Sequence, residues 1–599
     1  MKPKMFNLSE RRSQNYFLKV IFLLVVFVYF SLNGFPSTPG LWKGNTADWH
    51  LATNWDDNSI PDNTVDVLIP TNPTGGTFPI VSADADCRNL TVEPLASITI
   101  AATFTLNVNG SVIIKSNITG TGALLDLGTL NVTGTTTIER YINGVSGYHY
   151  ISNSVKDATL EQIDDDVALR NLGFGYYDPA NPPYANQMPN IWKMDETHST
   201  PNPAAQGAWL APNSIDETMT NGRGYALVAN SSTVIDISGA EFNTGDINFN
   251  ITRTAMGGGA EGTGGNGWHI IGNPYPSPLD WNAVCNDLPA GVSHTATFFY
   301  TTSIYYGAFG YYHPIAGPSG SYPHNRYIPS NQGLYINTTV NNTITFKNTH
   351  RTVATAALST TYYKSNKADK KKRPILRVKG TLLPDNGLND ATVIFFDTVA
   401  TTTFNGKTDA YKLMNTEPLV PNIYSMKDNK KLSINGLPEI TDMLEIPIGF
   451  EISTPGAYTI DAYEITNFPQ DVDIFLEDRS SNNVQNLRIN PVYTFNINKS
   501  ADNDRFVIRF ELTATKINKT NFINNASIYT SANTLYVNLN TENKLSADVE
   551  IYNVQGQKVA ESLKAISGSN EYNLNLNKGC YIINLRSDKL NINKKVYFN

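Results

Sequence analysis

The chain has 599 residues, enough for about three to five domains of roughly 100–200 residues each. Charged residues make up 16% of it, against roughly 25% in an average soluble protein, and 31 tyrosines accompany many Thr, Asn, Ser and Gly residues. The formal net charge of −8 argues against a general nucleic-acid binder, which needs a basic surface. The three cysteines, Cys87, Cys285 and Cys580, are too far apart for a disulfide framework or a zinc pattern, so large apolar cores must supply the stability.

Residues 1–40 have the pattern of a secretory signal peptide. A basic flank precedes a short apolar run, Val20 to Leu32, and small residues follow it. The alternative is a single membrane anchor, because the run is only slightly shorter than the ~20 residues that span a bilayer. We expect cleavage, and a mature chain that opens near Leu41.

Residues 41–147 are predicted to form a β-rich, repeat-like module. Three tryptophans, Trp42, Trp49 and Trp55, stand close together at its start. Short apolar runs such as Ile98–Val108 follow, and Gly or Asn separates most of them. Runs of this kind and spacing predict stacked hairpins or a small β-solenoid.

The central part of the chain is predicted to be β-rich as well. Residues 148–363 are rich in Tyr, Gly and Pro and favour strands with long loops, with one helix over about 157–172. A charged linker is expected over 364–374. Short alternating strands in 375–512 predict a β-sandwich, and 513–525 lacks a clear period and is interpreted as a second linker.

The last segment, 526–599, alternates apolar and polar residues with a period of two. In TLYVNLN, for example, Leu535, Val537 and Leu539 share one face. Several such runs with turn residues between them predict a compact, Ig-like sandwich. The fold class is therefore all-β and multidomain.

Three motifs of this segment resemble the type A C-terminal sorting domain of the type IX secretion system of Bacteroidota. They read EIYNVQGQKV, LNKGCYIINL and NKKVYFN, in that order along the chain. The residues that match the family pattern are Gly556, Val559, Leu576, Gly579, Tyr581, Lys594 and Lys595. The family usually opens with Tyr-Pro-Asn-Pro, whereas this chain has NNASIYTSANTLYV without proline.

The resemblance implies an export route. The signal peptide would lead the chain to the periplasm, the outer-membrane translocon would recognise the sorting domain, and a sorting protease would remove it. The remaining protein would be released or attached to surface lipopolysaccharide. This places the working protein at the cell surface or outside the cell.

The stretch GWHIIGNPYPSPLDWN is similar to a recurrent segment of large Bacteroidota surface proteins. Its residues Ser277, Pro278 and Asp280 suit the N-cap, N1 and N3 positions of a short helix that ends near Leu288. A structural corner is the favoured interpretation. The alternative is a loop that presents aromatic side chains to a sugar.

Aromatic residues in this stretch and in YTTSIYYGAFGYYHP form the candidate binding surface, since rigid aromatic faces stack on sugars or fill interfaces. Packing in the core is the competing interpretation. The candidates are Tyr275, Trp281, Tyr305, Tyr306, Tyr311 and Tyr312.

The sequence contains no H-E-x-x-H, G-x-S-x-G or P-loop motif, and its eight histidines are scattered. The match to G-x-G-x-x-G at Gly257, Gly259 and Gly262 lacks a βαβ context and is interpreted as a hairpin loop. Residues Asp164 to Asp166 are interpreted as a solvated helix face rather than a calcium site. We expect no metal and no cofactor.

The sequence therefore favours a non-catalytic, adhesin-like or structural exoprotein that contacts carbohydrate or a host or matrix surface. The alternative is a secreted polysaccharide- or protein-degrading hydrolase. It stays open because the paired carboxylates of a glycosidase meet only in the folded chain.

Overall fold

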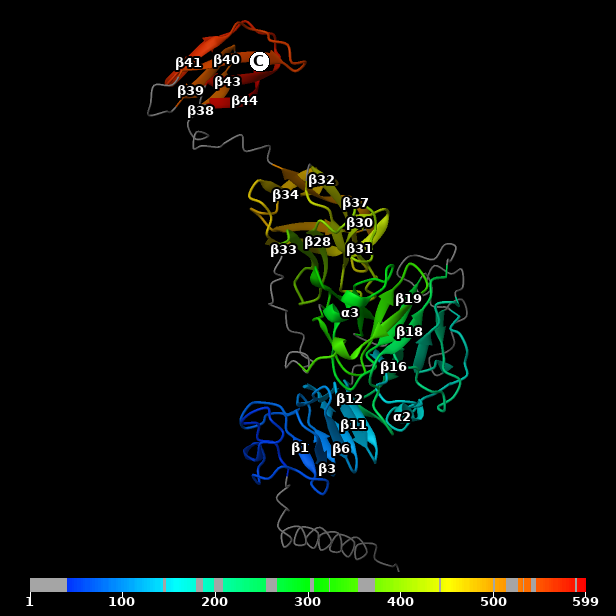
Figure 1. Ribbon diagram of the computed structural model, residues 1–599. Helices are drawn as coiled ribbons and strands as arrows, with labels where there is room; N and C mark the ends of the chain where they lie inside the picture. The colour runs from blue at the N-terminus through cyan, green and yellow to red at the C-terminus, as the bar shows by residue number, and fades with distance from the viewer. Residues whose placement is uncertain are drawn as a thin grey trace, which may run out of the picture. The chain divides into compact units, whose positions relative to one another are not determined.

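The computed structural model describes residues 40–143, 147–178, 187–198, 208–254, 267–301, 306–322, 324–353, 372–440, 443–498, 501–512, 526–531, 533–539, 546–587 and 590–598. The signal peptide, the second linker, most of the charged linker and the Gly257–Gly262 motif lie outside these residues. The chain divides into two compact units, Met1–Leu512 and Thr513–Asn599. Strands dominate both (Figure 1), which confirms the all-β class.

The first strands form a parallel β-solenoid with three sheets, so the solenoid prediction is confirmed over the hairpin alternative (Figure 1). Within these three sheets the solenoid strands pair in parallel and stack in register, as in the series Val67, Leu90, Val112 and Thr136. Strands β8 and β9 form a separate antiparallel pair. The sheet orders are β1-β4-β7-β12, β10-β5-β2 and β11-β6-β3, and β17 joins β12 antiparallel. The strands are β1 (Val67–Ile69), β2 (Ile80–Val81), β3 (Ala85–Cys87), β4 (Leu90–Val92), β5 (Ser97–Ile100), β6 (Thr105–Val108), β7 (Val112–Ile114), β8 (Ser116–Asn117), β9 (Gly120–Thr121), β10 (Ala123–Asp126), β11 (Thr129–Val132), β12 (Thr136–Ile142) and β17 (Thr233–Gly239).

The three tryptophans cap the open end of the solenoid. Leu41 pairs with Leu68 on the edge of β1 that faces away from β4, and a 3-10 helix, η1 (Ala52–Asn54), follows. The ring of Trp55 lies 4.9 Å from that of Trp42 and 4.7 Å from that of Trp49, and all three rings are buried in the solenoid core. A solenoid needs such a cap because its last rung would otherwise expose apolar side chains to water.

The middle region, from residue 147 to 353, consists of small antiparallel sheets. Their orders are β13-β16-β14-β15, β18-β26, β19-β25-β21-β22-β23 and β20-β24. The elements are β13 (Gly147–Ile151), α2 (Glu161–Asp164), β14 (Ile191–Met194), β15 (Trp209–Leu210), β16 (Tyr225–Ala229), β18 (Ile247–Ile251), β19 (Trp268–Gly272), β20 (Leu279–Asp280), α3 (Trp281–Asp287), β21 (Ala296–Thr301), β22 (Gly307–His313), β23 (Gly317–Gly320), β24 (Tyr327–Ile328), β25 (Gly333–Asn337), β26 (Asn342–Phe346) and η4 (Asn348–His350).

The helix predicted over 157–172 is wrong in length, because α2 covers only Glu161–Asp164. The carboxylate of Asp164 accepts the backbone N–H of Leu169 at 2.6 Å. A side chain that takes such a donor replaces the main-chain bond that would continue a helix. The prediction of one buried apolar face holds for Ile163, which is 0% exposed.

The short helix at Trp281 is confirmed, but its predicted cap is not. The N-cap of α3 is Asp280, whose side chain accepts the N–H of Asn282 at 3.1 Å. Leu279 and Asp280 pair with β24 as the strand β20, so the helix cannot begin at Pro278.

Residues 375–512 form one continuous sheet of 11 strands, with the order β35-β34-β37-β32-β30-β31-β28-β27-β33-β36 and β29 beside β31. Strands far apart in this order face each other across one apolar core, where Phe495 of β36 contacts Phe450 of β32 and Phe506 of β37. The strands are β27 (Ile375–Leu382), β28 (Asn389–Phe396), β29 (Ala410–Tyr411), β30 (Asn422–Lys427), β31 (Lys430–Leu437), β32 (Leu444–Glu451), β33 (Gly456–Thr466), β34 (Val472–Asp478), β35 (Asn483–Asn486), β36 (Val492–Ile497) and β37 (Ala501–Leu512).

The second unit has two sheets, β38-β39-β42 and β41-β40-β43-β44, packed around one core. The predicted inward residues Leu535, Val537 and Leu539 are buried there. The strands are β38 (Ala526–Ser531), β39 (Thr534–Leu539), β40 (Ser546–Asn553), β41 (Leu563–Ile566), β42 (Gly568–Asn573), β43 (Gly579–Ser587) and β44 (Leu590–Phe598).

Candidate binding pocket

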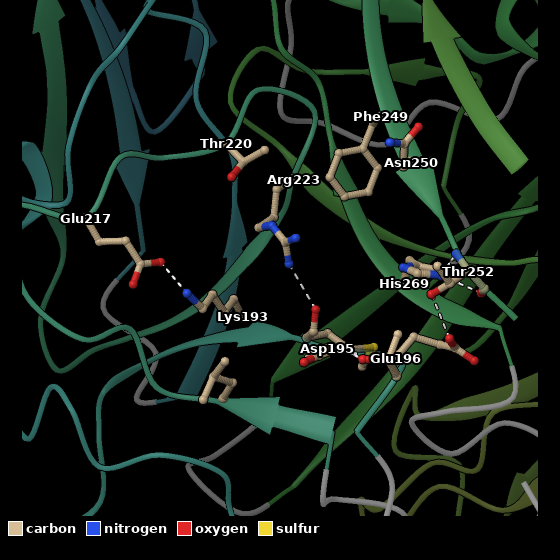
Figure 2. A pocket seen from close by; sticks show the side chains of 13 residues that line it. Lys193, Asp195, Glu196, Glu217, Thr220, Arg223, Phe249, Asn250, Thr252 and His269 are labelled. Atoms are coloured by element: carbon tan, nitrogen blue, oxygen red, sulfur yellow. Dashed lines mark hydrogen bonds and ion pairs between the residues drawn. The ribbon is translucent and has the colours of Figure 1, made fainter. Parts of the chain in front are cut away.

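A polar pocket of about 370 Å³ opens in the middle region (Figure 2). Its walls come from the end of β14 and the residues after it, from the segment that precedes β16, and from β18 and β19. These segments are far apart in the sequence, so the pocket exists only in the folded unit.

Glu196 is the most buried carboxylate of the pocket, with 1% of the residue exposed. It accepts the hydroxyl of Thr252 at 2.7 Å, the hydroxyl of Thr254 at 2.9 Å, and the backbone N–H groups of Thr254 and Gly267 at 2.6 and 2.9 Å. A carboxylate with four donors is held as an acceptor and joins the segments around it. Its role is therefore structural.

Asp195 is engaged in the same way. Its oxygens accept the hydroxyl of Tyr176 at 2.6 Å and both the N–H and the hydroxyl of Thr197 at 3.0 and 2.6 Å. Burial acts to raise the pKa of Asp195, but these hydrogen bonds outweigh it and hold the pKa below its usual value. The hydrogen bond to Asp195 raises the pKa of Tyr176 to about 12.

Glu217 forms an ion pair with Lys193, and their side chains are 21% and 18% exposed. The other oxygen of Glu217 accepts the N–H of Asn213 at 3.0 Å. The dashed line between Lys193 and Glu217 in Figure 2 marks this pair.

His269 on β19 contacts the backbone of Thr252. Its Nε2 lies 2.9 Å from the backbone nitrogen of Thr252 and 2.8 Å from the carbonyl oxygen of the same residue. Burial lowers the pKa of His269, which favours the neutral imidazole.

Arg223 differs from these residues because most of its N–H donors have no hydrogen-bond partner in the described part of the chain. One guanidinium N–H donates to the carbonyl of Met194 at 3.0 Å, and the guanidinium carbon lies 5.5 Å from the centre of the Phe249 ring. Among the described residues no carboxylate forms an ion pair with it. A guanidinium has five N–H donors, so several can reach a ligand in the pocket.

The sequence around Arg223 explains its position. Gly222 has a φ of +81°, and a Cβ at Gly224 would lie 2.2 Å from the side chain of Ile270. The two glycines let the chain pass close to β19, where Arg223 forms a bridge to Ile271. Arg223 was not among the residues predicted from the sequence, and the Asn-Gly-Arg-Gly stretch at residues 221–224 is the signal that could have marked it.

Of the six predicted aromatic residues, the five that the structure describes do not line this pocket. Four of them are in the interior, with exposed fractions of 0% for Tyr275, Trp281 and Tyr311 and 4% for Tyr312. These low exposed fractions support the competing interpretation, which is packing in the core. Tyr306 is 43% exposed, and Tyr305 lies outside the described residues.

The polar atoms of the buried rings are satisfied inside the protein. The hydroxyl of Tyr275 donates to the carbonyl of Gly245 at 2.6 Å, and the indole N–H of Trp281 donates to that of His294 at 2.9 Å. These side chains therefore help to fix the corner rather than face solvent.

The corner around Tyr275 contacts the solenoid through Arg351. The Arg351 side chain is 0% exposed, lies 2.6 Å from the carboxylate of Asp126, and donates to the carbonyl of Leu124 at 2.8 Å and the hydroxyl of Ser277 at 2.7 Å. Its guanidinium also lies 4.8 Å from the centre of the Tyr275 ring. This arrangement gives the Asn-Pro-Tyr-Pro-Ser-Pro stretch a structural role at the end of β10.

In the second unit, the turn motif has the geometry expected of it. Gly556 has a φ of +80°, its N–H donates to the carbonyl of Asn553 at 3.0 Å, and Val559 pairs back with Ile551 at 2.9 Å. Val559 packs against the core.

The remaining motif residues lie on or near the last strands. Leu576 packs against the core, Gly579 begins β43, and the hydroxyl of Tyr581 donates to the carbonyl of Asn577 at 2.8 Å. Lys594 and Lys595 on β44 are exposed. The lysines are therefore the motif side chains that a binding partner can reach most easily.

Comparison with known families gives two matches. A family described as "Domain of unknown function (DUF8693)" matches residues 41–510, and the chain belongs to this family. The family described as "Secretion system C-terminal sorting domain" matches residues 530–599. The second match confirms the resemblance, so the chain is exported by the type IX machinery to the cell surface or the extracellular space.

Other comparisons add little. No curated protein matches the chain significantly. A solved structure titled "Biofilm associated protein - BSP domain" aligns with 77% of this chain and 92% of its own, at 7% identity and a TM-score of 0.11. A likeness this low supports no conclusion about fold or function.

Within the described ranges, no three His, Cys, Asp or Glu side chains gather as a metal site would require. Among the same residues, no helix has the length and apolar character needed to cross a membrane.

Proposed function

We propose that this protein is a non-catalytic, adhesin-like binding protein of the cell surface, whose working part is residues 41–512. The observation that carries the proposal is the sorting domain, attached to a separate unit that contains a polar pocket with an uncommitted arginine. The ligand would be carbohydrate or a host or matrix surface. A purely structural role for the exoprotein predicts no ligand.

The chemistry of the pocket supports binding over hydrolysis. A general acid, base or nucleophile must be able to exchange a proton with the substrate or attack it. Asp195, Glu196 and Glu217 instead accept between two and four hydrogen bonds or ion pairs from the protein itself. Arg223 is the side chain best able to serve a ligand.

The proposed route has four steps. The signal peptide is removed near Leu41, the translocon recognises the second unit, and the sorting protease cleaves within residues 513–525. The remaining unit is attached to surface lipopolysaccharide of the outer membrane. The exposed lysines of β44 are candidates for recognition by the translocon.

A paired binding and turnover assay on the secreted protein tests this function. We expect retention on at least one polysaccharide, matrix protein or cell surface from a broad panel, without release of sugar or peptide. Turnover that is abolished by Asp195→Asn or Glu217→Gln would replace this proposal with the hydrolase alternative. Absence of binding across the panel would leave only a structural role for the exoprotein.

A further inference from the structure

We propose that the Arg223 pocket binds the carboxylate of an acidic sugar, such as a terminal uronic acid unit of a surface polysaccharide. This inference rests on the proposed binding function and specifies the ligand class. The inference depends on which polar groups of the pocket already form hydrogen bonds or ion pairs within the protein and which remain able to bind a ligand.

The first step concerns the guanidinium of Arg223. Stacking near Phe249 and one hydrogen bond to Met194 hold it in place, while its other N–H donors have no partner among the described residues. Figure 2 shows the guanidinium between the Phe249 ring and the segment that contains Asp195 and Glu196. A planar fork of donors is complementary to a carboxylate, which it can bind through two parallel hydrogen bonds.

The second step concerns the charge around it. Lys193 and Arg223 give the lining two positive groups, and Asp195, Glu196 and Glu217 give it three negative ones. Lys193 is neutralised by Glu217, which leaves Arg223 as the cation available to a ligand. An excess of one negative charge opposes every anion, and it opposes a doubly charged group such as a phosphate monoester more strongly than a single carboxylate. The carboxylate must therefore be held by direct hydrogen bonds to Arg223.

The third step concerns hydroxyl groups. The side-chain carbonyl of Asn250 accepts the hydroxyl of Thr343 at 2.7 Å, while its NH₂ group has no partner in the described part of the chain. Thr220, which is exposed, lines the same pocket. Neutral donors and acceptors of this kind suit the hydroxyl groups of a sugar ring.

The size of the pocket agrees with such a ligand. A volume of about 370 Å³ is at the low end of the ~300–1,000 Å³ that small-molecule sites occupy. Such sites are mostly apolar, whereas this lining is dominated by polar and charged side chains. A small, hydroxyl-rich ligand with one carboxylate matches both properties.

Titration calorimetry of the full chain with matched glycosides tests the inference. The probes are the methyl glycosides of glucuronic and galacturonic acid, compared with those of glucose and galactose, which differ only in lacking the carboxylate. We expect binding of at least one acid and at least about tenfold weaker binding of its neutral counterpart, because hydrogen bonds to charged groups are the strong ones.

Substitution of the arginine gives a second readout. We expect Arg223→Gln to abolish the preference for the acid and Arg223→Lys to retain part of it. Arg88→Gln, which changes an exposed arginine on the solenoid, should leave binding as in the wild type. If Arg223→Gln fails to fold, two measurements still test the inference. They are the binding of the probes by Arg223→Lys and the ratio of the wild-type affinities for the acid and the neutral glycosides.

Three results would overturn the inference. They are equal binding of acid and neutral sugars, an acid preference that survives Arg223→Gln, and no binding of any of the four probes. If the chain still binds another ligand from the broad panel, the proposed function stands and only the ligand class is wrong.

Discussion

The solenoid and the middle region are both packed from β-strands. They differ in how far apart along the sequence the contacting residues lie. In the solenoid, Leu90 pairs with Val112 and Val112 with Thr136, so each rung contacts its neighbour along the chain. In the middle region, the hydroxyl of Tyr150 bonds that of Tyr335 across 185 residues of sequence. The first is built from a repeating pattern, whereas the second depends on single polar contacts that close long loops.

Mild acid should have the largest effect, and it should act on the middle region. Burial lowers the pKa of His294 and His324 to about 4 and that of His313 to about 3, from an ordinary value of 6.5. Below pH 6.5 the unfolded chain binds protons that the folded chain rejects, so stability is expected to fall as the pH falls from 6.5 towards 4.

Calorimetric scans at pH 7.5, 6.0 and 5.0 measure this effect. The sequence of the second unit, 513–599, contains no histidine, so its transition provides the internal comparison. The result that would contradict this prediction is an unfolding transition of the first unit that depends on pH as little as that of the second unit. His294, His313 and His324 would then not be neutral in the folded chain.

Arg351→Met should have the next largest effect, because it removes a buried ion pair that is one of the contacts between the solenoid and the middle region. Removing one partner of a buried ion pair costs about 3–5 kcal/mol, and Arg351 and Asp126 have side chains that are 0% and 5% exposed. Denaturant titration should show a lower midpoint. Arg88→Met removes an exposed ion pair and is the matched control, with little change expected.

Tyr335→Phe should have a smaller effect that reports on the middle region alone. It leaves the buried hydroxyl of Tyr150 without its partner at 2.7 Å, which costs about 1–3 kcal/mol. The double variant Tyr150→Phe/Tyr335→Phe should lose less than the sum of the two single variants. Strict additivity would show that the two hydroxyl groups do not interact.

Gly556→Ala should have the smallest effect and should be confined to the second unit. The φ of +80° disfavours any side chain, but a Cβ there would meet no atom within 4 Å, so a cost of about 1 kcal/mol is expected. Gly224→Ala is a useful contrast, since its Cβ would meet the side chain of Ile270 at 2.2 Å. If Gly556→Ala also shifts the unfolding transition of the first unit, the two units do not unfold independently.

The features that sequence analysis predicted are the periodic ones. Alternation in TLYVNLN predicted the inward residues of β39, and the spacing of apolar runs predicted the solenoid as one of two options. The sorting motifs were recognisable because Gly556 and its neighbours act within one local turn.

The features that were missed are single residues with distant partners. Arg351 contacts Leu124 across 227 residues, and Arg223 contacts Met194 across 29, without any repeating pattern to mark them. The abundance of aromatic residues also pointed away from the pocket, because Tyr275, Trp281 and Tyr311 serve the core. Only the folded chain brings the pocket residues together.

Peptide mapping by mass spectrometry of the native protein, from outer-membrane and culture-fluid fractions, tests the division of labour between the two units most directly. We predict peptides from Leu41 to near Leu512 at full stoichiometry, and none from Tyr581 to Phe598 once the protein is outside the cell. If the C-terminal peptides persist at full stoichiometry on the surface, the second unit is part of the working protein and the proposed cleavage does not occur.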